Sequence, residues 1–253
     1  MDVLAIIPAY NEGGRIENVL AVLREVSELE EIIAVDDGST DSTAEDIRRV
    51  AMSDHRIRLL SMPTNQGKGQ AVLAAVAFVQ TPYILMLDAD LVNLSPKHVR
   101  DLISPVAHGN ADMTLGLFKG GHFTTDLSHW GTPWLTGQRC LKSEIFERLD
   151  KESAGGYALE IALTVTAQRH DLRVQRVPMR GVWHPSSAYH RGIRAGLRWH
   201  VNMVVQVWRG WLANNGPQTL RTHLIRSLHH FWHDPLYAWP AARKQLIKLK
   251  EWL

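Results

Sequence analysis

The sequence predicts an α/β fold in which a mostly parallel central sheet is flanked by helices, with a helical extension at the C-terminal end. Short apolar runs alternate along the chain with segments whose apolar residues recur at helical spacing, as in strand–helix–strand units. The apolar runs are continuous, which is typical of parallel strands that are buried on both faces. The 253 residues are enough to bury a large core in one such domain.

Most of this alternation lies in residues 1–117. Strands are expected at residues 3–8, 31–36, 57–62, 83–87 and 111–117. Helices are expected at residues 16–26, 42–52 and 70–79, and from Ser95 onward. Two helix starts carry sequence signals: Ser42 and Glu45 have the spacing of a capping box, and Ser95 precedes a proline in the first turn. Together these elements predict a doubly wound sheet.

The pattern changes after residue 117. A polar, glycine-containing loop is followed by two helices, two short strands and a long helix, expected at residues 119–126, 143–149, 157–170, 172–177, 181–184 and 193–212. We therefore expect one domain over residues 1–188, with halves 1–117 and 118–188, and an amphipathic helical extension over residues 189–253.

Composition excludes several classes of protein. The net charge of +2 is too small to predict a nucleic-acid partner. The single cysteine, Cys140, excludes a disulfide framework and a cysteine-based zinc site. The N-terminal residues lack the features of a signal peptide, and no apolar run reaches the roughly 18–20 residues of a membrane-spanning helix. We expect a cytoplasmic protein.

Carboxylates follow two of the expected strands. Asp36 and Asp37 end the second strand, and Asp88 and Asp90 follow the fourth. The carboxyl ends of parallel strands meet at one edge of a sheet, where open α/β sheets bind ligands. Carboxylates gathered there repel each other unless a cation or a hydrogen-bonding ligand is present, and Asp-x-Asp suits a hard divalent cation. The alternative is that these aspartates only cap the helices that follow.

The loop around Gly67, Lys68 and Gly69 lacks the spacing of a P-loop. It still combines a flexible backbone, a cation and a helix N-terminus, which all favour a phosphate group. An ordinary glycine-containing turn explains the same residues equally well.

Four motifs, in this order, resemble the nucleotide-sugar-binding half of GT-A glycosyltransferases of family 2 and its relatives. They cover about residues 1–117 and are Pro8-Ala9-Tyr10-Asn11-Glu12, Val35-Asp36-Asp37-Gly38-Ser39-Thr40-Asp41, Asn65-Gln66-Gly67-Lys68-Gly69 and Leu87-Asp88-Ala89-Asp90-Leu91. The resemblance implies a GT-A fold and a nucleotide-diphosphate sugar donor, with UDP-hexose favoured over GDP-hexose.

The second half is similar to glucosyl-3-phosphoglycerate synthases and their small bacterial relatives. The segments that carry this similarity are Gly120-Gly121 with Thr124-Thr125-Asp126, Leu135-Thr136-Gly137-Gln138-Arg139, Gly156-Tyr157-Ala158-Leu159-Glu160-Ile161 and Arg180-Gly181-Val182-Trp183-His184. The chain is shorter than those synthases, and His122 stands where their acceptor loop carries an arginine. The acceptor therefore stays open, as does the choice between inversion and retention at the sugar.

The two resemblances imply roles for individual residues. Asp90 and His184 would bind Mg²⁺ or Mn²⁺, and Glu160 would lie over the donor sugar as a catalytic residue together with Asp90. The donor would contact Pro8, Ala9, Tyr10, Glu12, Asp37, Ser39, Lys68, Asp88 and Ala89. The acceptor would contact Gly121, His122, Thr125, Gln138 and Arg139.

The chemistry of the side chains supports the metal role of His184 and the catalytic role of Glu160, and it also allows a structural role for each. A glycosyl donor leaves as a nucleotide diphosphate, whose developing charge a metal neutralises. His184 could add a nitrogen ligand, which suits Mn²⁺ as well as Mg²⁺, or it could be a hydrogen-bonded surface histidine. Glu160 stands in an apolar helix start, either as a partner of the helix dipole or as a working carboxylate near the sugar, and we favour the second.

Six of the nine tryptophans lie after residue 198, in the expected C-terminal extension. An amphipathic, tryptophan-rich and basic segment fits a helix on an anionic membrane, at the inner face of the membrane in this case. It equally fits a helix packed on its own domain or on a second subunit of a homodimer. Membrane contact would imply a polyisoprenyl-phosphate acceptor, contacted by Arg191, Arg194 and Arg198.

We therefore expect a metal-dependent glycosyltransferase that moves a hexose, with glucose favoured, from a UDP-sugar to an acceptor hydroxyl or phosphate. The acceptor would be a small phosphorylated molecule or a lipid phosphate. A membrane-surface polyisoprenyl-phosphate glycosyltransferase is the alternative within the same class, and a non-catalytic nucleotide-sugar-binding protein is the alternative of another class. A nucleotidyltransferase is disfavoured because the first strand is followed by residues 9–12, Ala-Tyr-Asn-Glu, and not by a glycine-rich basic loop.

Overall fold

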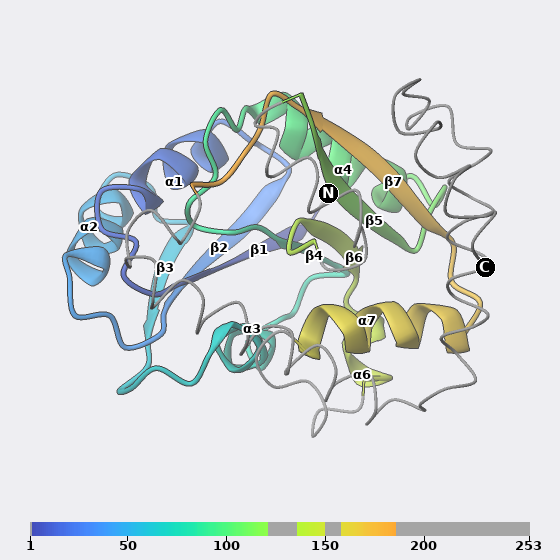
Figure 1. Ribbon diagram of the computed structural model, residues 1–253, viewed down its shortest axis with the longest axis horizontal. Coiled ribbons are helices and arrows are strands. Elements are labelled where there is room, and N and C mark those ends of the chain that lie inside the picture. Colours follow the sequence, from blue (N-terminus) through green and yellow to red (C-terminus); the bar gives the residue numbers. More distant parts are fainter. Residues whose placement is uncertain (1, 121–135, 150–157, 186–253) are drawn as a thin grey trace, which may run out of the picture. The chain divides into compact units, whose positions relative to one another are not determined.

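The computed structural model describes residues 2–120, 136–149 and 158–185 (Figure 1). The chain divides into two compact units, Met1–Asn214 and Asn215–Leu253, and all of the described residues belong to the first. The predicted boundary at residue 188 and the predicted C-terminal extension lie outside the described residues.

The described part contains a seven-stranded sheet in the order β3-β2-β1-β4-β6-β5-β7. The strands are β1 (Val3–Ala9), β2 (Leu29–Asp36), β3 (Ile57–Ser61), β4 (Tyr83–Met86), β5 (Met113–Lys119), β6 (Arg139–Lys142) and β7 (Val174–Arg180). β1 to β4 run parallel, β6 is antiparallel to both of its neighbours, and β7 is parallel to β5. β1, β2 and β4 therefore all end at the same edge of the sheet.

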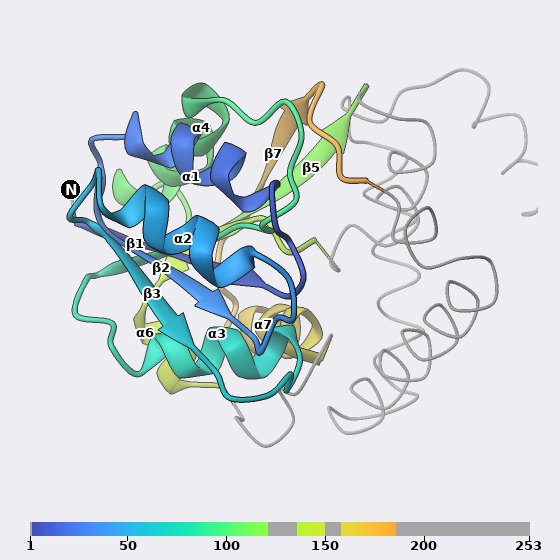
Figure 2. The same ribbon diagram turned by 90° about the vertical axis from the view of Figure 1, so that its left-hand side faces the viewer.

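Helices cover both faces of this sheet. They are α1 (Ile16–Arg24), α2 (Thr43–Ala51), α3 (Lys68–Val76), α4 (Pro96–Ala107), α6 (Glu144–Glu147) and α7 (Ala158–Arg169). Figures 1 and 2 show α1, α2 and α4 on one face and α3, α6 and α7 on the other. Each face has its own cluster of buried apolar side chains.

The central strand β1 explains why the apolar runs are continuous. Val3, Ala5 and Ile7 point into the core beneath α1 and α4, while Leu4 and Ile6 point into the core above α3 and α7. Successive strand residues face opposite sides, so a strand covered on both sides needs apolar residues at every position.

The expected fold class is confirmed: the central sheet is mostly parallel and is flanked by helices. Strand β6 was not predicted. The expected strand at residues 181–184 is reduced to one bridge between Val92 and Trp183. Within the described residues, no helix combines the length and the apolar composition that crossing a membrane requires.

Ser42 and Ser95 precede α2 and α4, as expected, but neither side chain makes a capping hydrogen bond to its helix. The Ser42 hydroxyl instead donates to the Asp46 carboxylate at 3.0 Å. Pro96 stands in the first turn of α4, as expected. The Ser95 hydroxyl lies 2.9 Å from His98 Nδ1.

Candidate functional site

The centre of the site is a lysine held between two carboxylates. Lys68 Nζ lies 2.6 Å from Asp88 Oδ1 and 2.9 Å from Glu160 Oε1. The three residues come from the start of α3, the segment after β4 and the first turn of α7. Glu160 is only 1% exposed, and its Oε2 atom has no hydrogen-bond partner among the described residues. A buried carboxylate oxygen without a partner is costly, so it is available to a ligand.

Asp37 fixes the loop that presents this lysine. Its two carboxylate oxygens accept hydrogen bonds from the backbone N–H groups of Gln66 and Gly67, both at 2.8 Å. Gly67 has a φ of 92°, a left-handed conformation that favours glycine, and Lys68 then begins α3. Asp37 is itself 2% exposed. The sequence predicted donor contact for Asp37, whereas the described hydrogen bonds of its carboxylate go to the Lys68 loop.

Asp88 is held on both carboxylate oxygens. Oδ1 pairs with Lys68, and Oδ2 accepts a hydrogen bond from Gln138 Nε2 at 2.7 Å. The Gln138 side-chain oxygen also accepts the backbone N–H of Asp88 at 3.0 Å. Gly137 comes so close that a Cβ atom there would lie 2.2 Å from Lys68 Nζ and 2.7 Å from Asp88 Oδ1. A side chain at position 137 would therefore force the Lys68 ammonium group or the Asp88 carboxylate to shift.

Asp90 and His184 are brought to the same region by a long-range backbone contact. Val92 and Trp183 exchange two backbone hydrogen bonds, at 2.8 and 3.2 Å, next to these two residues. His184 also packs edge-to-face on Phe118, with ring centroids 5.7 Å apart. Both side chains are partly exposed.

The loop after β1 forms the next side of the site. The backbone N–H groups of residues 11–14 donate to side chains of the loop after β2 and of the start of α2, at 2.8 to 3.0 Å; the acceptors are Ser39, Asp41, Thr43 and Asp46. Asn11 has a φ of 56° there. Arg15 Nε donates to Glu12 Oε2 at 2.5 Å. Residues that are 28 to 32 positions apart in the sequence thus form one hydrogen-bonded surface at the carboxyl edge, as parallel topology requires.

The carboxylates of this edge affect each other's ionisation. Burial raises the pKa of Asp90 above its ordinary value, and the negative charge of Asp88 adds to the rise, while His184 opposes it. Burial and the charge of Asp90 raise the pKa of Glu12 to about 7, against the opposing effect of Arg15. Burial alone would raise the pKa of Asp88, but Lys68 and Gln138 hold it below its ordinary value. The mutual repulsion of Glu12 and Asp90 is what a bound cation would relieve.

The residues present fit a divalent metal that is shared with a ligand. Among the described residues, no group of three or more His, Cys, Asp or Glu side chains is arranged to hold a metal by itself. Asp90 and His184 supply one carboxylate and one imidazole. Mg²⁺ is commonly bound by one or two carboxylates together with water and substrate phosphates, and imidazole suits Mn²⁺. The pair is therefore suited to a metal that completes its coordination with a diphosphate.

Several predicted residues converge in this region. Lys68, Asp88 and Glu160 are in contact, and His184 acts electrostatically on both Asp88 and Asp90. Pro8, Ala9, Tyr10, Ser39 and Ala89 lie at the ends of β1, β2 and β4 or just beyond them. Gly121, His122 and Thr125 lie outside the described residues.

The predicted acceptor contacts of Gln138 and Arg139 stay predictions, and both side chains have contacts within the protein. Gln138 is 1% exposed and holds Asp88, and Arg139 is 0% exposed and donates to Thr136 and Thr164. Both residues therefore lie next to the residues of the candidate site.

Two contributors were missed in the sequence. The need for glycine at position 137 depends on the approach of chain segments that are about 50 residues apart, and no local pattern reports it. Arg15 could have been found, because it stands three residues after Glu12, the spacing of a helical ion pair.

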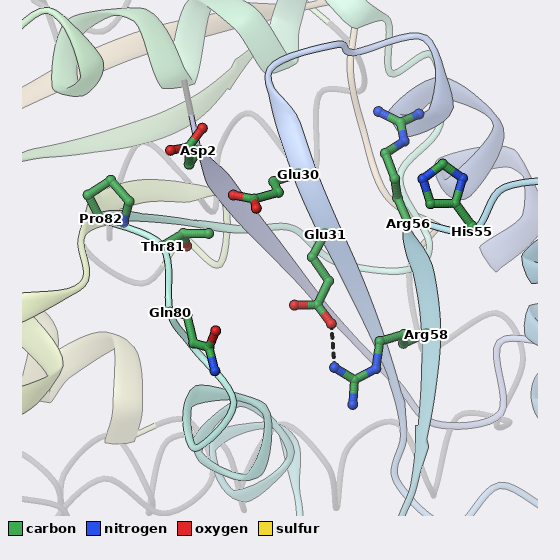
Figure 3. A pocket seen from close by; sticks show the side chains of 9 residues that line it. All are labelled: Asp2, Glu30, Glu31, His55, Arg56, Arg58, Gln80, Thr81 and Pro82. Carbon is green, nitrogen blue, oxygen red and sulfur yellow. Dashed lines mark hydrogen bonds and ion pairs between the residues drawn. The ribbon is translucent and has the colours of Figure 1, made fainter.

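A pocket lies at the amino edge of the parallel strands, opposite the candidate site. It is a pocket of about 460 Å³ in which the side chains of Arg56, Arg58, Glu30 and Glu31 gather before or at the start of β2 and β3 (Figure 3). Arg58 pairs with Glu31 at 2.5 Å, and Arg56 bonds to backbone carbonyls and to Asp54. These arginines are engaged in structural contacts, so we place the functional site at the carboxyl edge.

Solved structures share this fold. A structure of glucosyl-3-phosphoglycerate synthase from Mycobacterium tuberculosis in complex with phosphoglyceric acid superimposes with a TM-score of 0.64 and 23% identity, covering 83% of this chain and 79% of that one. A structure of the same enzyme with Mn²⁺, UDP-glucose and phosphoglyceric acid gives a TM-score of 0.61 and 22% identity, covering 81% and 79%. The likeness confirms the predicted GT-A fold.

Curated relatives match over shorter segments. A dolichyl-phosphate beta-glucosyltransferase of Trichomonas vaginalis is 45% identical over 94 residues, which are 34% of this chain and 28% of that protein. The dodecaprenyl-phosphate galacturonate synthase of Rhizobium johnstonii is 27% identical over 146 residues, 54% of this chain and 43% of that protein. The chain spans less than half the length of these two relatives.

A family model covers more of the chain than either relative. The model described as glycosyl transferase family 2 matches residues 4–158, which include β1 to β6 and the Asp88–Asp90 segment. The match exceeds half of the chain and contains Lys68, Asp88 and Asp90, whereas Glu160 and His184 lie beyond it. The chain therefore belongs to glycosyl transferase family 2.

Proposed function

We propose that this protein transfers a hexose from a UDP-sugar to a phosphorylated acceptor in a metal-dependent reaction. The observation that carries the proposal is the convergence of Lys68, Asp88, Asp90, Glu160 and His184, from four separate segments, at the carboxyl edge of one sheet. No structural role of the sheet itself requires this group of charges, and a sugar diphosphate with a divalent cation matches it.

Different residues would contact the metal, the nucleoside, the phosphates and the sugar of the donor. Asp90 and His184 would hold Mg²⁺ or Mn²⁺, which when bound supplies positive charge beside the diphosphate leaving group. The loops 10–14 and 38–43 form the surface for the nucleoside, and Lys68 adds a cation beside the phosphates or the base. Glu160 has a buried oxygen that can accept a hydrogen bond from a hydroxyl group of the donor sugar.

The bond changes follow from this arrangement. The bond between the anomeric carbon and the diphosphate oxygen breaks, a bond from that carbon to the acceptor oxygen forms, and UDP leaves. If the acceptor atom is a hydroxyl oxygen, it also gives up a proton, whereas a phosphate oxygen does not. Because Glu160 is paired with Lys68, we assign it to the orientation of the sugar rather than to proton removal.

Fold neighbours support the donor and the metal. Glucosyl-3-phosphoglycerate synthase has been solved with Mn²⁺ and UDP-glucose, and with Mg²⁺ and UDP. It has also been solved with the phosphate-bearing acceptor phosphoglyceric acid. At 22% to 24% identity these complexes establish nothing about the substrate of this chain, but they show that the fold accommodates such ligands.

A second candidate acceptor is a polyprenyl phosphate. The names of the curated relatives support it, since they include dolichyl-phosphate beta-glucosyltransferases and a dodecaprenyl-phosphate galacturonate synthase. The tryptophan-rich segment 189–253 is the part of the sequence that fits a membrane surface. For this candidate we expect the intact chain to sediment with anionic liposomes and a chain ending at Asn215 to stay in solution; an intact chain that stays in solution would contradict it.

A donor screen tests the main proposal. We expect UDP-glucose to raise the melting temperature of the protein in the presence of Mn²⁺, more than GDP- or dTDP-sugars do, and we expect slow release of glucose from UDP-glucose. Stabilisation without any turnover, for every acceptor offered, would favour the non-catalytic sugar-nucleotide-binding alternative. Absence of any effect at millimolar sugar nucleotide would contradict both.

A further inference from the structure

Arg139, at the start of β6, has the largest fully buried side chain among the described residues. Its exposed fraction is 0%. Arginine is almost never fully buried unless it is paired, because transfer of a charged group out of water is expensive. A buried arginine next to a candidate active site therefore calls for a specific reason.

The hydrogen bonds of Arg139 connect two parts of the site. Nε donates to the backbone oxygen of Thr136 at 2.9 Å, and Nη1 donates to Thr164 Oγ1 at 3.2 Å. The Thr164 hydroxyl in turn donates to the backbone oxygen of Glu160 at 2.8 Å. A hydrogen-bonded path thus runs from the Thr136–Gln138 turn, which holds Asp88, to the first turn of α7, which carries Glu160.

Charge gives a second, independent link to Glu160. Burial lowers the pKa of Arg139 to about 10, and the negative charge of Glu160 opposes that fall. The guanidinium therefore remains charged at neutral pH. Counted with Lys68, it gives two cations beside the two anions Asp88 and Glu160. Removal of one member of a buried charged group leaves an uncompensated charge, which is strongly unfavourable.

We propose that Arg139 is a positioning residue for the Glu160 carboxylate: it fixes the first turn of α7 through Thr164 and balances the buried negative charge beside Lys68. The inference rests on the proposed role of Glu160 at the donor sugar. Arg139 itself touches no substrate, because its side chain is fully enclosed. It acts through the rotamer and the charge of Glu160.

A purely structural role makes different predictions. If Arg139 only stabilised the contact between β6 and α7, its loss would lower the melting temperature and leave kcat unchanged below that temperature. As a positioning residue, it should affect kcat far more than the affinity for UDP, because the UDP contacts lie on other elements. Misplacement of a reacting group by about 1 Å can cost about a hundredfold in rate.

The test compares Thr164→Val, Arg139→Met and Arg139→Lys with the control Arg148→Met, in which an exposed arginine is removed from α6. The probes are UDP-glucose with Mn²⁺ for turnover and UDP for binding by calorimetry. The single cysteine, Cys140, reports on the integrity of β6, because burial raises the pKa of its thiol to about 12 and it should resist thiol reagents while β6 is intact.

We expect kcat to fall about tenfold or more in Thr164→Val and further in Arg139→Met, with an unchanged UDP dissociation constant and an unreactive Cys140. Arg139→Lys should retain part of the kcat that Arg139→Met loses, because lysine keeps the positive charge but lacks the planar guanidinium group. Wild-type kcat in a folded Thr164→Val variant would overturn the inference, even if Arg139→Met does not fold.

A crystal structure of Thr164→Val gives a readout that does not depend on activity. We expect the Glu160 carboxylate to leave its position 2.9 Å from Lys68 Nζ. A carboxylate that stays in place would overturn the inference. Failure of the proposed function is a separate result, seen as a wild-type protein that neither binds UDP nor consumes UDP-glucose.

Discussion

Asp88 and Asp90 are separated by one residue, and their surroundings give them different roles. Both oxygens of the Asp88 carboxylate are engaged, one by Lys68 and the other by Gln138. Asp90 is only half-buried, and its pKa is raised by burial and by the charge of Asp88. The first aspartate therefore holds the protein part of the site together, while the second remains available for a cation.

At the residue scale, Glu160→Gln should separate donor binding from transfer. Glutamine keeps the volume of the side chain but removes the charge that pairs with Lys68 and replaces one of the two acceptor oxygens by an N–H₂ donor. We expect kcat to fall about a hundredfold and the UDP dissociation constant to change less than about threefold, measured by steady-state kinetics and calorimetry. The matched control is Glu144→Gln, an exposed glutamate of α6. Equal losses in binding and in transfer would reduce Glu160 to a structural residue.

Gly137→Ala should disturb the ion pair between Lys68 and Asp88. The added Cβ would lie 2.2 Å from Lys68 Nζ and 2.7 Å from Asp88 Oδ1, so the ion pair between Lys68 and Asp88 would have to shift. Overpacking of this kind typically costs about 1–3 kcal/mol of unfolding free energy. We expect that loss in urea denaturation, together with at least a tenfold fall in UDP-glucose turnover. A folded variant with wild-type turnover would show that the close approach of Gly137 has no functional importance.

At the scale of elements, the loop before α3 is positioned by a side chain from the end of β2. Asp37 accepts two backbone N–H groups, and this places Lys68 at the start of the helix. Asparagine has one acceptor oxygen and would place an N–H₂ group against one of those donors. We expect Asp37→Asn to lose about 1–3 kcal/mol of unfolding free energy and to bind UDP-glucose more weakly.

The matched control for that variant is Asp101→Asn, which changes an exposed aspartate paired with Lys97 on α4. Its effect on stability should stay within about 0.5 kcal/mol, because exposed ion pairs contribute little. If the two variants lost equal stability, or if Asp37→Asn bound UDP-glucose as the wild type does, Asp37 would have no special role in placing the lysine.

The same elements show how far the sequence could be interpreted. β1 to β4 and the helices between them were predictable, because apolar runs buried on both faces and helical periodicity are local signals. β6 was not, since it has only four residues, begins with arginine and ends with lysine. It lies in the sheet because it pairs antiparallel with β4 and β5, which are distant in sequence. Local pattern cannot report such pairing.

Some residues of the candidate site could likewise be predicted from the sequence, and the contacts of others could not. Lys68, Asp88, Asp90, Glu160 and His184 were predicted because motifs and strand ends mark them. Gln138 and Arg139 were expected at an acceptor, and the sequence did not predict that their side chains are buried and hydrogen-bonded next to the site carboxylates. Their contacts join residues about 25 to 50 positions apart, so they depend on the tertiary fold alone.

At the scale of the whole molecule, one mostly parallel sheet brings segments that are distant in sequence into one site. The strand ends of β1, β2 and β4 bring acids to a common edge, and the bridge between Val92 and Trp183 adds His184 from the far end of the described domain. Burial raises the pKa values of Glu12 and Asp90, and the repulsion between neighbouring carboxylates adds to the rise. The domain is thus assembled around charges that a metal diphosphate would neutralise.

The most direct test of this claim is calorimetric titration of UDP into the wild-type protein and into Asp90→Asn, each with Mn²⁺ and with EDTA. We predict that the wild type binds UDP at least tenfold more tightly with Mn²⁺ than with EDTA, and that Asp90→Asn abolishes the difference, because the metal and the diphosphate then share no protein carboxylate. Equal affinity for UDP with Mn²⁺ and with EDTA in the wild type, or an undiminished Mn²⁺ effect in Asp90→Asn, would contradict the account.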